Sequence, residues 1–211
     1  MKVNEIYRSI QGESSFSGLP CVFVRLTYCN LRCTYCDSQY AFYEGKDLTV
    51  EEVLEVVEQY KTPLVEITGG EPLLQKEVFP LMERLVGSGH TVLLETGGSL
   101  SISEVHPKVI KIIDLKCPSS GESHRNLYSN IEMLQPHDEI KFVVGTRQDY
   151  LWAKELIARY SLAGRFTLLL STVFNKIEPR EVVGWMLEDG LPMRFQVQLH
   201  KTIWAPEARG V

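Results

Sequence analysis

The chain has 211 residues, a formal net charge of −5 and 44% hydrophobic residues, which is an ordinary globular composition. A chain of this length fits one domain, so we expect residues 1–211 to form a single domain. No apolar run approaches the roughly 18 residues of a membrane-spanning helix. No apolar segment follows Met1–Glu5 either, so we expect a cytoplasmic protein without a membrane partner. The mildly acidic charge argues against direct binding of nucleic acid.

Short apolar runs rich in β-branched residues alternate along the chain with segments of helical period. In chain order, the sequence predicts a strand at Cys21–Tyr28, a helix after Thr49, a strand at Leu64–Thr68, a helix at Gln75–Gly87, strands at Thr91–Glu95, Val109–Leu115 and Ile140–Val144, a helix at Leu151–Tyr160, and strands at Phe166–Leu170 and Phe195–Leu199. Thr49 and Glu52 form a capping box at the start of the first helix. This alternation predicts an α/β fold with right-handed βαβ units and a mainly parallel sheet.

Residues that can do chemistry follow several of the predicted strands. They are Cys29, the segments Gly69–Pro72, Glu95–Gly98 and Asp114–Lys116, and the pair Gln198 and His200. In open α/β sheets, ligands bind beyond the carboxyl ends of the strands. We therefore predict one binding site at that edge of the sheet.

Three of the five cysteines lie within eight residues of one another. Cys29, Cys33 and Cys36 have the spacing C-x3-C-x2-C, and an odd number of cysteines without a secretion signal does not suggest a disulfide framework. Three thiolates on one loop can bind three irons of a 4Fe–4S cluster and leave the fourth iron open. We interpret the other two, Cys21 and Cys117, as small buried hydrophobic residues.

Two other interpretations of the cysteines remain open at this point. Structural zinc normally takes four nitrogen or sulfur ligands, so it would need a further ligand such as Cys21 or Cys117. A redox-active pair formed by Cys33 and Cys36 would leave Cys29 without a role. The zinc interpretation would make the chain a non-catalytic, metal-stabilised binding module.

The cysteine motif, with Tyr35 directly before the last cysteine, resembles that of the radical S-adenosylmethionine (SAM) superfamily. Further segments resemble one family within it, the 7-carboxy-7-deazaguanine synthases of queuosine biosynthesis, a tRNA modification pathway. These segments are Ser9–Glu13, Gly18–Arg25, Cys36–Ser38, Thr68–Pro72, Glu95–Gly98 and Gln198–Lys201. The resemblance implies a (β/α) barrel of the radical SAM type. A full eight-stranded barrel typically needs about 250 residues, so we expect an abridged, open one.

The resemblance also implies a reaction. The expected enzyme is a carbon–nitrogen lyase that converts 6-carboxy-5,6,7,8-tetrahydropterin into 7-carboxy-7-deazaguanine with loss of ammonia, after a 5′-deoxyadenosyl radical has abstracted a hydrogen atom. Its implied cofactors are a 4Fe–4S cluster, SAM and Mg²⁺. Its implied partners are the small-molecule pterin, an electron donor such as flavodoxin or ferredoxin, and a second copy in a homodimer. Another radical SAM enzyme, such as a glycyl-radical-enzyme activase, would share the cysteine motif.

By resemblance, the expected site residues fall into three groups. The metal ligands are Cys29, Cys33 and Cys36 for the iron–sulfur cluster and Ser38 for Mg²⁺, with Asp37 as an alternative oxygen ligand. The residues expected to bind SAM are Tyr35, Asp37, Gly70, Glu95, Thr96, Asp114, Leu115, Lys116 and Ser171. The residues expected to bind the pterin are Ile10, Gln11, Gly12, Glu13, Arg25, Thr68, Gln198, His200 and, at the chain end, Pro206 and Val211. The sequence identifies no acid or base for ammonia loss.

Arg25 is the expected cation for the pterin carboxylate, because its planar guanidinium suits carboxylates. It interrupts an apolar strand, where an unpaired charge would be costly, so an internal Arg–Glu pair is the alternative. His200, taken alone, is more often a satisfied buried histidine. Ser38, likewise, could simply cap a turn.

Overall fold

The computed structural model describes all 211 residues and contains one nine-stranded sheet. The strands are β1 (Lys2–Ile10), β2 (Pro20–Leu26), β3 (Lys46–Asp47), β4 (Leu64–Gly69), β5 (Thr91–Thr96), β6 (Ile110–Asp114), β7 (Glu139–Val144), β8 (Thr167–Thr172) and β9 (Arg194–Phe195). The α-helices are α1 (Val50–Gln59), α2 (Val78–Gly87), α3 (Arg147–Arg159), α4 (Pro179–Asp189) and α5 (His200–Ile203). Short 3₁₀ turns occupy Gln39–Phe42, Pro72–Leu74, Pro118–Ser120, Ser123–Arg125 and Tyr128–Met133.

The sheet is parallel from β2 to β9 in the order β2-β4-β5-β6-β7-β8-β9, and β1 and β3 extend it in antiparallel pairing beyond β2. The two edge strands, β3 and β9, do not pair with each other, so the barrel stays open. The predicted α/β fold with a mainly parallel sheet in an abridged, open barrel is thereby confirmed. None of its helices has the length and apolar character needed to cross a membrane.

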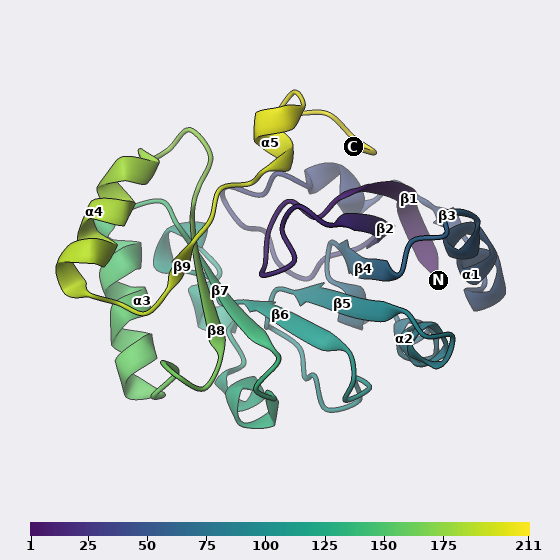
Figure 1. Ribbon diagram of the computed structural model, residues 1–211, viewed down its shortest axis with the longest axis horizontal. Coiled ribbons are helices and arrows are strands. Elements are labelled where there is room, and N and C mark those ends of the chain that lie inside the picture. Colours follow the sequence, from purple (N-terminus) through teal and green to yellow (C-terminus); the bar gives the residue numbers. More distant parts are fainter.

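The curved sheet separates two apolar cores. Helices α1 to α4 lie around its outer, convex face (Figure 1), and 35 buried residues form the outer core between sheet and helices. A second set of six buried residues, here called the inner core, lies on the other face. It consists of Cys21, Phe23, Leu64, Leu93, Ile112 and Leu169. Alternate residues of each strand point to opposite faces, which explains why neighbours such as Phe23 and Val24 belong to different cores.

Local sequence signals explain where the helices begin. The predicted capping box is present at α1, where Thr49 accepts a hydrogen bond from Glu52 N and Glu52 accepts one from Thr49 N. Helix α1 then buries Val53, Leu54 and Val57 against the sheet, which stabilises the fold by roughly 1.5–3 kcal/mol per side chain. Helix α3 begins four residues before the predicted Leu151 because Thr146 caps it by accepting from Asp149 N.

Several predicted boundaries differ from the structure. Helix α2 starts at Val78 rather than Gln75, because Pro72–Leu74 form a separate 3₁₀ turn. The predicted strand Phe195–Leu199 is wrong beyond Phe195, and His200 begins α5 instead. There the chain leaves the sheet edge, and Leu199 N donates to Gly12 O at 3.0 Å. Strands β1 and β3 and helix α4 were not predicted from the sequence.

Candidate active site

One large cavity, of about 700 Å³, opens on the concave side of the sheet. All of the residues expected to bind the cluster, Mg²⁺, SAM or the pterin line it, except Leu115 and Ser171. Leu115 is buried in the outer core, and Ser171 is buried in β8 beside Val143. Residues from both ends of the chain and from most of its strands therefore meet around one space.

The three clustered cysteines lie on the loop after β2, at the cavity wall. Cys29, Cys33 and Cys36 are unpaired and partly exposed. The loop is fixed from outside, because Thr34 donates from N and Oγ1 to Ser120 O and Ser119 O at 3.0 and 2.8 Å. Burial raises the pKa of all three thiols, that of Cys33 to about 11. Metal binding would have to release those protons.

Gly70 and Glu71, which follow β4, have different structural roles. A Cβ at Gly70 would collide with Tyr28 O, so only glycine lets the two loops approach this closely. The Glu71 carboxylate points away from the cavity and accepts hydrogen bonds from Leu73 N, Thr96 Oγ1 and Gly97 N at 2.8–3.1 Å. Burial raises the pKa of Glu71. This side chain holds the ends of β4 and β5 together.

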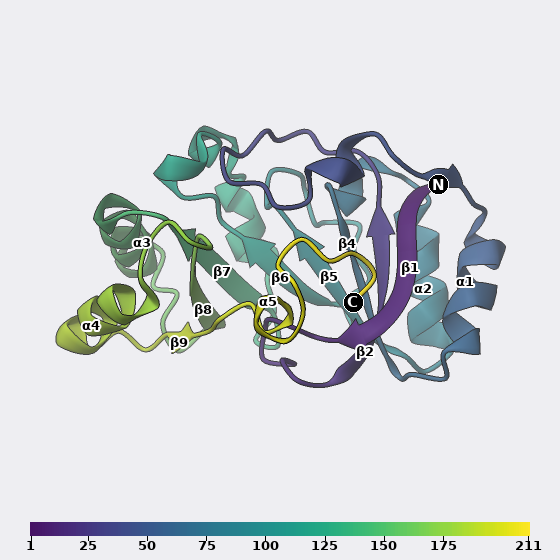
Figure 2. The ribbon, with the colours of Figure 1, turned by 90° about the horizontal axis from the view of Figure 1, so that it is seen from above.

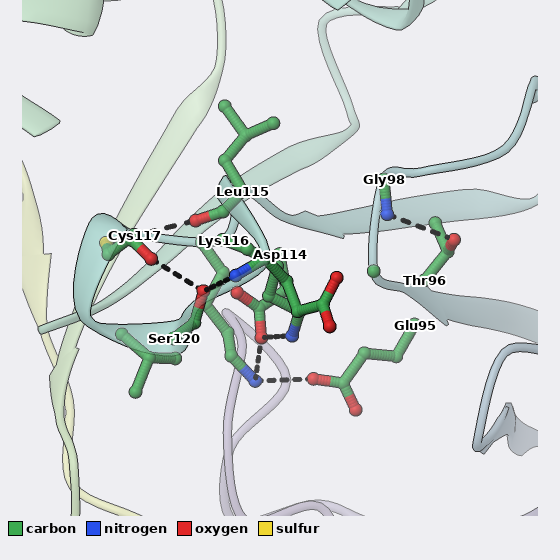
Figure 3. A network of polar contacts seen from close by, with 12 residues as sticks. Glu95, Thr96, Gly98, Asp114, Leu115, Lys116, Cys117 and Ser120 are labelled. Atoms are coloured by element: carbon green, nitrogen blue, oxygen red, sulfur yellow. Dashed lines mark hydrogen bonds and ion pairs between the residues drawn. The ribbon is translucent and has the colours of Figure 1, made fainter. Parts of the chain in front are cut away.

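Asp114 and Lys116 stand at the end of β6, next to Glu95 at the end of β5 (Figure 3). Lys116 Nζ donates to Asp114 Oδ2 at 2.8 Å, while Asp114 Oδ1 is buried without a hydrogen-bond partner. Asn126 holds the backbone of Lys116 from both sides, with hydrogen bonds of 2.9 and 3.0 Å. Leu115 points away from this group (Figure 3). A polar ligand could satisfy the free Asp114 oxygen from the cavity.

A buried ammonium lies deeper, on β7. Lys141 Nζ is 2.5 Å from both Glu13 Oε2 and Glu95 Oε1 and 3.9 Å from Asp114 Oδ2. Burial acts to lower the pKa of Lys141, but the surrounding carboxylates raise it well above its ordinary value. Lys141 therefore stays charged and joins Glu13, from the loop after β1, to the strand ends.

Gln11 and Glu66 form a buried polar pair that lines the cavity. Glu13 N donates to Gln11 Oε1 at 3.0 Å, which orients the amide so that Gln11 Nε2 donates to Glu66 Oε2. The pKa of Glu66 is raised by burial and by the nearby Glu95 and Glu13. Because β1 is antiparallel to β2, with Ile10 opposite Pro20, the segment Gln11–Glu13 enters the cavity at the amino ends of the parallel strands. The cysteines enter at the opposite end.

Arg25 lines the cavity and also has internal partners. Its Nε donates to Glu5 Oε1 at 2.8 Å and its Nη2 to the Tyr7 hydroxyl at 2.9 Å, while Nη1 has no hydrogen-bond partner in the protein. Tyr40 lies against the guanidinium, 5.9 Å from ring centre to Cζ. The internal Arg–Glu pair considered from the sequence is therefore present, and one donor group still faces the cavity.

Asp37 and Ser38 follow the last cysteine and meet the C-terminal part of the chain. Lys201 Nζ is 2.6 Å from Asp37 Oδ2, and Gln198 Nε2 is 3.4 Å from the same oxygen. Burial would raise the pKa of Asp37, but the Lys201 charge and these hydrogen bonds hold it well below its ordinary value. Ser38 stands at the N-cap of the turn Gln39–Phe42 without a side-chain capping bond, and its Oγ donates to Asp37 Oδ1 at 3.1 Å.

Helix α5 and the segment after it cover the cavity. The segment Pro206–Val211 crosses over the concave face of the sheet, and all six of its residues line the cavity (Figure 2). Arg209 stacks on Tyr40 at 3.8 Å and pairs with Glu44 at 3.0 Å. A Cβ at Gly12 would collide with the His200 ring, so glycine there lets α5 dock.

Comparison with known proteins identifies the family. Residues 24–184 match the model of the radical SAM superfamily. The chain is 46% identical to a 7-carboxy-7-deazaguanine synthase of Koribacter versatilis, with both chains covered completely. It is 47% identical to one of Chlorobaculum tepidum, over the whole of this chain and 97% of that one. The chain belongs to the 7-carboxy-7-deazaguanine synthase family. The crystal structure of QueE from Escherichia coli has the same fold, with a TM-score of 0.78 over 94% of each chain at 22% identity.

As a radical SAM protein of the 7-carboxy-7-deazaguanine synthase family, the chain uses a 4Fe–4S cluster and SAM. The donor set fits: three free thiols on one loop supply three thiolates, and the unpartnered Asp114 oxygen offers an acceptor to a ligand hydroxyl. No three Cys, His, Asp or Glu side chains surround one point as the ligands of a single metal ion would. A cubane needs no such point, because each cysteine binds a different iron.

Several side chains that line the cavity were not predicted from the sequence. Glu66 and Lys141 lie within apolar strands, and Glu5, Tyr7 and Tyr40 surround Arg25. A charged residue inside an apolar strand is the signal that could have indicated Glu66 and Lys141, as it did for Arg25. The superfamily match covers the cysteine loop and the carboxyl ends of β4, β5 and β6, whereas Gln11–Glu13 and Gln198–Val211 lie outside it. The cavity therefore includes residues from both ends of the chain that lie outside the superfamily match.

Proposed function

We propose that the chain converts 6-carboxy-5,6,7,8-tetrahydropterin into 7-carboxy-7-deazaguanine with release of ammonia, in queuosine or related deazapurine biosynthesis. One observation carries the proposal beyond family membership. The cavity joins a three-thiol loop to the buried charged groups Lys141 and Glu66 and the partly buried Arg25, a set that suits a small anionic ring system. A cation near one end meets the carboxylate of the pterin, and hydrogen-bonding groups at the other end meet its ring edge.

The cofactors have defined places in this proposal. When bound, the cluster and SAM supply a 5′-deoxyadenosyl radical that takes a hydrogen atom from the substrate. Cys29, Cys33 and Cys36 would hold the cluster. The Gly70 backbone, Glu95, Thr96, Asp114 and Lys116 would hold SAM, with Tyr35 beside its adenine; Leu115 and Ser171 could contribute only through their backbone or through packing, since their side chains do not line the cavity. Ser38 would supply one oxygen ligand to Mg²⁺, which usually keeps several waters.

The chain's own residues would orient the substrate and exclude water. Arg25 would bind the pterin carboxylate through its free Nη1. Thr68 on the neighbouring strand β4 is the register partner of Arg25 and lies beside it. Gln11, Gly12, Glu13, Gln198 and His200 would complete the pocket, and the segment Pro206–Val211 would close it. Water exclusion protects a reactive intermediate and strengthens the electrostatic contacts of the site.

Partners and location are part of the same proposal. A small redox protein such as flavodoxin or ferredoxin would reduce the cluster. We propose a homodimer because the two-residue edge strands β3 and β9 leave the sheet open, and because the side chains of Leu187 on α4, Val197 after β9 and Ile203 on α5 are exposed. The free thiols of Cys29, Cys33 and Cys36 fit an enzyme of the reducing cytoplasm. We propose that residues 1–211 act as one domain.

An anaerobic assay tests the function directly. Protein reconstituted with iron and sulfide is mixed with SAM, a reductant, Mg²⁺ and the carboxypterin, and 7-carboxy-7-deazaguanine and ammonia are measured. We expect both products in equal amounts. Cleavage of SAM without any deazaguanine would instead support another radical SAM activity, such as activation of a glycyl-radical enzyme.

Substitution of Arg25 tests how the carboxylate is recognised. We expect Arg25→Gln to raise the KM for the carboxypterin about ten- to a hundredfold, the size expected for one charge-assisted hydrogen bond. Steady-state kinetics measure this, and Arg84→Gln serves as the control because Arg84 makes an exposed ion pair with Glu51 outside the cavity. An unchanged KM would show that the carboxylate binds elsewhere.

A further inference from the structure

Glu66 lies in the lower layer of the cavity, directly above the inner core. It is the third residue of β4 and stands beside Phe23 of β2 in the parallel register. The residue is 4% exposed and lines the cavity. Thr68 and Arg25 form the next layer up, paired in the same register. Two residues along a strand correspond to about 6.6 Å, which is comparable with the length of a two-ring heterocycle.

The partners of Glu66 leave part of its carboxylate free. Gln11 Nε2 donates to Oε2, and Oε1 has no hydrogen-bond partner in the protein. No lysine or arginine pairs with it, because Lys141 pairs with Glu13 and Glu95 instead. The charged or titratable groups that face it are Glu13 from the loop after β1, Tyr7 of β1, Cys21 of β2, Glu95 of β5 and Lys141 of β7.

A buried carboxylate without a cationic partner costs folding free energy unless something else satisfies it. Here it faces a ligand cavity, so a ligand edge that carries adjacent N–H donors can supply the missing hydrogen bonds. Two aromatic side chains line the cavity next to it: the rings of Tyr7 and Phe23 stack on each other at 5.1 Å with an angle of 13° between their planes. This combination suits a planar or nearly planar nitrogen heterocycle.

We propose that Glu66, oriented by Gln11, binds the 2-amino group and the N3–H of the substrate's pyrimidine ring and so sets the direction in which the pterin enters the cavity. The pterin carboxylate then lies one layer higher, at Arg25. The inference rests on the proposed function and adds the residue that selects the ring edge. The ring contraction rebuilds the other ring, so this edge is the same in substrate and product. The contact therefore acts on binding and affects KM more than kcat.

The variant Glu66→Gln tests the assignment, because it keeps the volume and an acceptor for Gln11 but presents an N–H₂ group to the ring donors. We expect the KM for the carboxypterin, and its Kd measured without reductant, to rise about ten- to a hundredfold, with kcat changed less than threefold. Glu139→Gln is the matched control, since Glu139 is also buried on a strand of this sheet but bonds to Ser15 and does not line the cavity.

An analogue of the carboxypterin that lacks the 2-amino group separates a ligand contact from a structural role. The parent enzyme should bind it about tenfold more weakly than the carboxypterin, and Glu66→Gln should not distinguish the two compounds. Equal discrimination by both proteins would overturn the assignment, as would an unchanged Kd in Glu66→Gln. Failure of the parent enzyme to make deazaguanine would instead reject the proposed function. The two failures are distinguishable, because the test of Glu66 compares the binding of two compounds and does not depend on product formation.

Thermal unfolding supplies a second readout. The pKa of Glu66 is raised on folding, so ionisation of Glu66 destabilises the fold as pH rises above 4.5, the ordinary glutamate value. Glu66→Gln removes that cost, and the ligand-free variant should unfold at the same or a higher temperature than the parent at pH 8. A lower unfolding temperature together with unchanged pterin affinity would identify Glu66 as a structural residue and reject the proposal.

Discussion

Replacement of Cys33 by alanine is expected to abolish the iron–sulfur cluster and turnover together. Two remaining thiolates, Cys29 and Cys36, cannot hold a cubane that the protein binds through only three ligands. Anaerobically purified Cys33→Ala should be colourless, contain less than one iron per chain and form no 5′-deoxyadenosine. Iron and sulfide analysis, the visible absorption spectrum and product formation measure the three effects.

Cys21→Ala provides the matched control for this experiment. Cys21 is also a free thiol, but it is fully buried in the inner core at the start of β2, and burial raises its pKa far above the ordinary value. This variant should keep its brown colour and its iron. Turnover that persisted in Cys33→Ala, or colour lost equally in both variants, would contradict the role assigned to the three clustered cysteines.

Replacement of Lys141 by methionine is expected to cause the largest loss of stability in the cavity. The variant leaves Glu13 and Glu95, whose side chains are 14% and 26% exposed, without their shared cation. Breaking one side of a buried ion pair in this way typically costs about 3–5 kcal/mol. Urea unfolding of the ligand-free protein, followed by circular dichroism, measures the loss. SAM binding should weaken as well, because Glu95, which we propose to contact SAM, loses its orientation.

Lys154→Met is the control, because Lys154 also forms an ion pair, with the single carboxylate of Asp189, but its side chain is 43% exposed. An exposed pair of this kind contributes about 0–1 kcal/mol. The loss of stability in Lys141→Arg should lie between those of the two variants, since arginine keeps the positive charge but does not match the geometry of the lysine site. If the free energy of unfolding of Lys141→Met lay within 1 kcal/mol of that of the parent protein, the buried ammonium would not be the link between the two ends of the site.

The parts of the fold that the sequence predicted are those with strong local signals. The capping box at Thr49 and the apolar stripe of α1 were sufficient for that helix, and β-branched runs were sufficient for the central strands. Strand β1 escaped prediction because most of its residues are only partly buried, so its sequence lacks an apolar face. Helix α4 escaped for a similar reason, since it buries only Val182 completely.

The predicted and missed residues of the site differ in how they are encoded. Cysteine spacing and glycine-rich segments are local features, and they indicated the loops at the strand ends. Lys111 and Lys141 show why mid-strand residues are harder, because both interrupt apolar strands. Lys111 lies on the face of the outer core and pairs with Asp138 at 3.1 Å, whereas Lys141 lines the cavity. Which face a residue occupies depends on the register with neighbouring strands, and that is a long-range property.

The same limit applies to residues whose partners are distant in sequence. Lys201 lies 164 residues from Asp37, and no local pattern indicated their ion pair. Glu71 belongs to a recognisable motif, yet its carboxylate holds two strand ends together rather than facing the cavity. A motif therefore indicates where a residue lies more reliably than what its side chain does.

The inner core determines how deep the cavity can be. Its six side chains close the space beneath Glu66, and only Phe23 among them also lines the cavity. Selection between two-ring and three-ring heterocycles would thus reside in Phe23 and in the aliphatic residues packed with it, such as Leu64 and Leu93, which belong to no catalytic motif. A comparison of related enzymes by motif alone would overlook these positions, although their bulk sets an upper limit on ligand length.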